Sequence, residues 1–73
     1  MTESVYKFIE LVGTSPESWE KAAAAAVRRA GTSLRELRVA EVSELDMVLG
    51  NDGSIEAYRA KVKLSFKYED QPD

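Results

Sequence analysis

The chain has 73 residues, a formal net charge of -3, and neither cysteine nor histidine. Disulfides and thiolate-bound zinc are therefore excluded. A domain this short buries only a small core, and small scaffolds usually gain stability from disulfides, metals or oligomerisation. We therefore expect a single domain over residues 1–73 that associates with itself, or else binds a metal through oxygen ligands.

The charge pattern also bears on the partners of the protein. Basic residues are scattered along an acidic chain, whereas a nucleic-acid-binding protein carries a basic stripe. No segment approaches the roughly 18 consecutive apolar residues that a membrane span needs. The first residues contain no basic run followed by an apolar stretch. We expect a soluble, cytoplasmic protein that has neither nucleic-acid nor membrane partners.

The first predicted element is a strand over residues 5–12. This segment, VYKFIELV, is rich in β-branched and aromatic residues and is followed by Gly13. Its apolar residues do not alternate cleanly, which indicates that both faces of the strand are partly covered.

A helix follows the strand. Ser15 is the predicted N-cap, Pro16 the first helical residue and Gly31 the left-handed terminator. Residues 22–26 are five alanines, the strongest helix formers, and they form a flat face suited to packing on a sheet. Trp19 is the bulky residue next to that face. We expect it to pack at a subunit or helix–sheet contact; stacking on a ligand is the alternative interpretation.

The third predicted element is a hairpin with strands at residues 38–49 and 55–68 and a glycine-rich turn at 50–54. The second strand alternates, so that its basic residues Arg59, Lys61 and Lys63 share one face. We expect an ordered core over residues 5–69 and a frayed tail at 70–73. The sequence thus predicts an α+β fold of order β-α-β-β, with one helix on the outer face of a three-stranded antiparallel sheet. One helix of this length is too short to cover the sheet, so a second copy is expected to complete the burial.

Several motifs within residues 5–69 are similar to those of the dodecin family: VYK at 5–7, IELVGTSP at 9–16, RRAGT at 28–32, EV at 41–42 and KLSF at 63–66. The resemblance implies a homododecamer, a hollow shell of twelve subunits with helices outside and sheets lining the interior. It also implies ligand binding, for which flavin is the family's best-known ligand.

Two positions that match the family's flavin pocket are altered. Val39 stands at the position of the stacking tryptophan, and Arg59 stands at the position of a glutamine. Valine has no ring to stack on an isoalloxazine, and arginine has donors but no acceptor. These two replacements therefore argue against flavin as a cofactor of this chain.

Acidic residues of the second predicted strand suggest a different ligand. Glu44 and Asp46 lie at i and i+2 and so share a face, and Asp52 lies in the turn that follows. Hard oxygen ligands suit calcium, although the spacing is not that of an EF-hand. The residues alone leave a second interpretation open, in which Glu44 and Asp46 pair with Arg59 and Lys61 across the hairpin. Similarity to a metal-binding branch of the family that lacks the flavin tryptophan favours calcium.

The expected function is non-enzymatic binding and storage of calcium by a hollow dodecamer. The alternatives are a flavin-binding shell and a purely structural oligomeric module. The candidates for catalysis are carboxylates, lysines and serines without a recognisable constellation. Glu41 with Lys61 is one conceivable acid–base pair, and an interior salt bridge is the simpler interpretation of these two residues.

Overall fold

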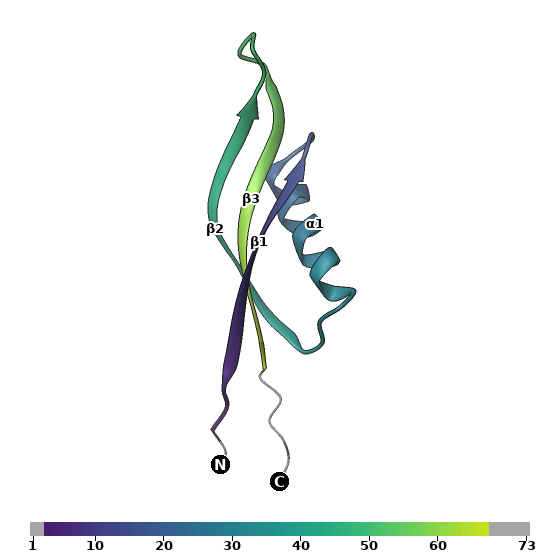
Figure 1. Ribbon diagram of the computed structural model, residues 1–73, viewed down its shortest axis with the longest axis vertical. Coiled ribbons are helices and arrows are strands. Elements are labelled where there is room, and N and C mark those ends of the chain that lie inside the picture. Colours follow the sequence, from purple (N-terminus) through teal and green to yellow (C-terminus); the bar gives the residue numbers. More distant parts are fainter. Residues whose placement is uncertain (1–2, 68–73) are drawn as a thin grey trace.

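The computed structural model describes residues 3–67 as a long three-stranded sheet with one helix on one side (Figure 1). The sheet order is β1-β3-β2, and both neighbouring pairs are antiparallel. The elements in chain order are β1 (Tyr6–Ser15), α1 (Trp19–Gly31), β2 (Leu37–Leu49) and β3 (Ile55–Lys67). The β-α-β-β prediction is confirmed. The predicted strand end at Tyr68 and the predicted tail at 70–73 lie outside the described residues.

The helix begins later than predicted. Ser18, not Ser15, is the N-cap, and its hydroxyl accepts a hydrogen bond from the Lys21 amide at 3.0 Å. Ser15 instead ends β1, opposite Tyr58 of β3. Its backbone is therefore extended in the sheet, and its hydroxyl accepts from the Glu17 amide in the turn before the helix.

The end of the helix also differs from the prediction. Gly31 is the last helical residue, and the cap falls on Thr32, which has right-handed φ and ψ of -76° and -19°. The Thr32 hydroxyl donates to the Arg29 carbonyl at 2.7 Å and so satisfies one of the free acceptors at the helix end. The left-handed conformation predicted for Gly31 occurs elsewhere, at Glu36 (φ 62°) and at Gly53 in the hairpin turn (φ 86°).

The core lies between the helix and the two strands β1 and β3. Small residues of the helix pack against the middle of β3, and the fully or nearly buried apolar residues are Ala22, Ala26, Ala30, Ala60, Val62 and Leu64. The predicted alanine face is therefore the buried face of the helix. Among the described residues, no helix has the length and apolar character that crossing a bilayer demands.

Strand β2 has almost no cover. The described part of the chain extends 59 Å along its longest axis, whereas a helix of 13 residues is about 20 Å long. The β2–β3 hairpin projects past the helix (Figure 1). Every β2 residue after Leu37 is exposed, including the apolar side chains of Val42, Leu45 and Met47. The mismatch between helix and sheet expected from the sequence is thus present in the structure.

A candidate ion-binding face on the sheet

The face of the sheet that points away from the helix carries the charged side chains. On β3, Arg59, Lys61 and Lys63 alternate with the buried residues of the core, as the sequence pattern predicts. Each of these cations has an acidic partner position on β2. The opposed pairs are Asp46 with Arg59, Glu44 with Lys61, and Glu41 with Lys63.

A β-bulge brings the three acidic residues of β2 onto this one face. The register between β2 and β3 shifts between Val42 and Glu44, so that Ser43 is the extra residue. Its hydroxyl donates to the Lys61 carbonyl at 3.3 Å. The shift also corrects one expectation, because Glu41 lies opposite Lys63 rather than Lys61.

Asp46 is held by a two-point ion pair with Arg59. The guanidinium donates from Nε to Oδ1 at 2.7 Å and from Nη2 to Oδ2 at 2.8 Å. These hydrogen bonds lower the pKa of Asp46 below its usual value and raise that of Arg59. Both side chains are about half exposed, so the pair is largely hydrated.

Glu44 has a looser partner. Its Oε1 lies 3.5 Å from Lys61 Nζ, and its side chain is 68% exposed. Both carboxylates line one hollow of about 140 Å³, together with Val12, Arg59 and Lys61. The structure therefore brings Glu44 and Asp46 together, and it shows the cross-hairpin ion pairs of the second interpretation.

The donor set can be compared with what calcium requires. Exposed carboxylates are suitable ligands, but calcium takes six to eight oxygens. Within residues 3–67, no group of three acidic side chains is arranged to hold a metal ion, and both oxygens of Asp46 already accept hydrogen bonds from Arg59. The described part of one chain thus supplies oxygen ligands of the right type but too few of them for a complete calcium site.

Asp52 has a local role in the hairpin turn. Its Oδ1 accepts from the Ser54 amide at 3.0 Å and from the Ser54 hydroxyl at 2.7 Å, and these hydrogen bonds lower the pKa of Asp52. Asp52 does not line the hollow that contains Glu44 and Asp46.

The two positions that match the flavin pocket do not meet within one chain. Val39 lies opposite Ser65, whereas Arg59 lies six residues earlier on β3, about 20 Å away along the strand. The hollow of about 160 Å³ beside Val39 contains no aromatic side chain; it is lined by Val27, Leu37, Arg38, Val39, Ala40 and Leu64.

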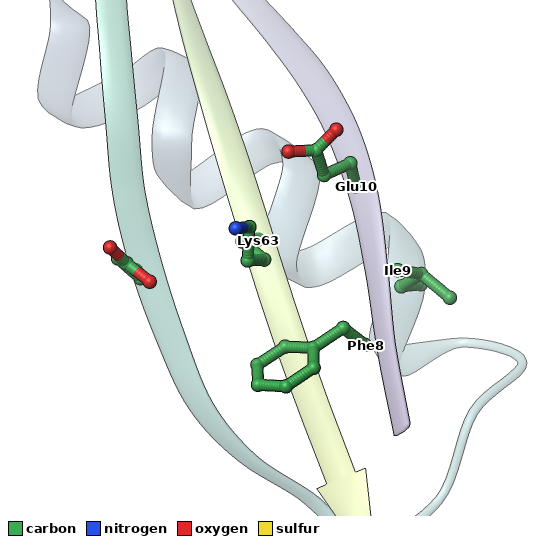
Figure 2. A pocket seen from close by; sticks show the side chains of 5 residues that line it. Phe8, Ile9, Glu10 and Lys63 are labelled. Carbon is green, nitrogen blue, oxygen red and sulfur yellow. The ribbon is translucent and has the colours of Figure 1, made fainter. Parts of the chain in front are cut away.

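The charged face that carries Glu44 and Asp46 contains a second hollow, which the sequence did not predict. It measures about 480 Å³ and is lined by Phe8, Ile9, Glu10, Glu41 and Lys63. Figure 2 shows Glu10 on β1 and Lys63 on β3 next to each other, with the Phe8 ring beside them. Glu10 and Glu41 both lie opposite Lys63 in the strand register. Regular alternation along β1 would have predicted that Glu10 shares a face with Lys63. The apolar residues of β1 do not alternate cleanly, so the sequence did not show which of its residues lie on this face.

Trp19 connects the helix to the strand that carries Asp46. Its Nε1 donates to the Asp46 carbonyl at 3.0 Å, and its ring makes an edge contact with Tyr58 at a centroid distance of 5.0 Å. The indole therefore fixes the backbone of β2 from the helix side.

Trp19→Phe should lower the free energy of unfolding by about 1 kcal/mol, because phenylalanine keeps a ring near Tyr58 but cannot donate to Asp46. Trp19→Leu, which also removes the ring contact, should cost more. Denaturant unfolding at one fixed subunit concentration measures both changes. An unchanged free energy of unfolding in Trp19→Phe would contradict a role for the indole hydrogen bond, and equal losses in the two variants would contradict a role for the ring contact.

Comparison with known proteins identifies the family. A dodecin family model matches residues 5–69. The chain is 55% identical over 64 residues to the calcium dodecin of Mycobacterium tuberculosis, covering 88% of this chain and 89% of that protein. It is 41% identical over 66 residues to the dodecin of Thermus thermophilus, covering 90% and 94%.

Solved structures agree with these matches. The crystal structure of the M. tuberculosis protein, described as a calcium-chelating antigen with a novel calcium-binding site, superposes with a TM-score of 0.80 at 52% identity; 96% of this chain and 100% of that chain are covered. Dodecin from Streptomyces coelicolor superposes with a TM-score of 0.88 at 32% identity, with coverage of 97% and 100%. The chain belongs to the dodecin family.

Proposed function

We propose that twelve copies of this chain form a hollow shell that binds and stores calcium without catalysing a reaction. The proposal is carried by the position of Glu44 and Asp46, two exposed carboxylates on one face of a strand that the subunit itself leaves uncovered. Calcium dodecin from M. tuberculosis, at 55% identity, supports calcium as the ion.

The incomplete donor set fits a site that assembly completes. Glu44 and Asp46 would contribute carboxylate oxygens, and Asp52 is a further candidate from the turn. Bound calcium would supply positive charge that neutralises these carboxylates and links strands. Since one chain provides too few ligands, calcium binding should depend on an intact shell.

Catalysis has little support from the residues on this face. They form cross-strand ion pairs, and the pair Glu41 and Lys63 lies in an open hollow on the sheet surface. Closed pockets with tuned acid–base groups are typical of enzymes. Flavin storage is the alternative within the family, and the valine at position 39 speaks against it because it offers no stacking surface.

The double variant Glu44→Gln with Asp46→Asn should weaken calcium binding at least tenfold, because amides carry no charge and coordinate calcium more weakly. Calorimetric titration of the native assembly with calcium, and separately with magnesium, measures the change. Glu10→Gln with Glu41→Gln is the matched control, since it removes two negative charges from the same face of the sheet, at the residues opposite Lys63.

The outcomes of this titration separate the candidate functions. Unchanged calcium affinity in the Glu44 and Asp46 variant would show that these residues are not the ligands. An equal loss of affinity in the control would show that the effect comes from the net charge of the face and not from coordination. A shell that binds no calcium but is yellow after purification would indicate flavin. A colourless shell that binds neither would indicate a structural module.

A further inference from the structure

Asp46 already has a cationic partner within the chain, the guanidinium of Arg59. Both carboxylate oxygens accept a hydrogen bond from one guanidinium, Nε to Oδ1 at 2.7 Å and Nη2 to Oδ2 at 2.8 Å. This is the bidentate geometry in which arginine binds a carboxylate most strongly. An ion that uses Asp46 as a ligand must therefore displace at least one of these two contacts.

Glu44 differs from Asp46 in this respect. It faces a single ammonium at 3.5 Å, a distance too long for a strong hydrogen bond, and it is the more exposed of the two carboxylates. The two candidate ligands are thus unequal: Glu44 is accessible to an ion, whereas Asp46 is already occupied.

We infer that Arg59 is a built-in competitor for calcium at Asp46, so that the ion binds by displacing the guanidinium and with lower affinity than the carboxylates alone would give. This inference rests on the proposed calcium function. Arg59 is 45% exposed, so a released guanidinium can be hydrated where it stands. In the ion-free shell, Arg59 balances the charge of Asp46 and limits carboxylate repulsion on this face.

The expected change in calcium affinity follows from the strength of the Asp46–Arg59 ion pair. Exposed ion pairs are weakly stabilising, with bidentate arginine pairs at the upper end of the range. Removing the competitor should therefore lower the calcium Kd about three- to fivefold. Because the competitor is attached to the chain, its effect cannot be removed by dilution.

The test is calcium titration of the assembled wild-type protein, Arg59→Gln and Lys61→Gln. Lys61→Gln is the matched control, because it removes one positive charge from the same hollow but breaks only the long contact to Glu44. We expect Arg59→Gln to bind about three- to fivefold more tightly than wild type, and Lys61→Gln to gain about twofold or less. Arg59→Lys retains the positive charge but cannot make the two-point contact with Asp46, so its calcium affinity should lie between those of wild type and Arg59→Gln.

Different failures have different meanings. If wild type binds calcium and Arg59→Gln binds no more tightly, or the Arg59 and Lys61 variants gain equally, the competitor role is overturned and the calcium function stands. If neither wild type nor Arg59→Gln binds calcium, the proposed function itself is overturned. A crystal structure of calcium-loaded wild type provides a readout that needs no variant: opening of the Asp46–Arg59 pair supports the inference, and persistence of both contacts beside bound calcium overturns it.

Discussion

Gly13→Ala should destabilise the subunit by about 3 kcal/mol, the largest effect that we expect from a single methyl group. A Cβ at this position would overlap the carbonyl oxygen of Ala22 and lie 3.0 Å from its carbonyl carbon and 3.2 Å from the Ala26 side chain. The first two atoms belong to the helix backbone, so no side-chain rotation relieves the clash. Overpacking a core costs 1–3 kcal/mol and occasionally more, and a backbone clash belongs at the upper end.

The close approach at Gly13 depends on its neighbours. Gly13 lies opposite Ala60 in the sheet, and both Ala60 and Ala22 are completely buried. Three small residues in a row allow the helix to lie directly on β1 and β3. An alanine at position 13 would lift the helix and loosen the contacts of the whole alanine face.

Gly31→Ala is the matched control, because a Cβ there meets nothing within 4 Å and the residue ends the helix without a left-handed backbone. It should leave stability unchanged or raise it by up to about 1 kcal/mol, since alanine is the better helix former. Thermal and denaturant unfolding at one subunit concentration would measure both variants. A Gly13→Ala protein as stable as wild type would contradict the helix position described above.

The fold could be predicted from the sequence because its patterns are regular where they matter. Strict alternation in β3 separates Arg59, Lys61 and Lys63 from the buried Ala60 and its neighbours, and the alanines identify the packing face of the helix. The start of the helix was harder to predict from the sequence, because Ser15 and Ser18 are equally suitable N-cap residues when only their neighbours in sequence are considered. Pairing of Ser15 with Tyr58, a contact between residues far apart in sequence, decided between them.

The candidate site was less predictable for the same reason. Glu41 and Glu44 are three residues apart, so alternation alone would place them on opposite faces of β2. The bulge at Ser43 puts them on one face and fixes which cation each one meets. Sequence identified Glu44 and Asp46 as a pair, but which cation each of them faces depends on the strand register, and the ligands from neighbouring subunits lie beyond a single chain.

Leu45→Asp should abolish the proposed shell. Val42, Leu45 and Met47 stand on the helix side of β2, where the helix leaves them largely uncovered; they are 47%, 52% and 42% exposed in the single chain. Leu45 and Val42 also border an apolar hollow of about 440 Å³ formed with Trp19 and the start of the helix. If a neighbouring subunit covers this surface, aspartate would be buried there without a partner.

An unpaired buried carboxylate costs several kcal/mol, and a shell of twelve subunits would contain it twelve times. In the single chain the same aspartate would be half exposed, so its cost falls on assembly rather than on the fold of the subunit. Light scattering after gel filtration should therefore show the 8.1 kDa chain in place of a particle with twelve times that mass.

Arg28→Asp provides the comparison, because it introduces the same side chain on the exposed side of the helix, opposite the buried alanines. This variant should still assemble, losing only a few tenths of a kcal/mol from the favourable charge at the helix end. An intact dodecamer of Leu45→Asp would mean that the apolar side of β2 is not a subunit contact. Assembly would then not explain the exposed apolar side chains of β2, and calcium ligands supplied across that contact would lose their structural basis.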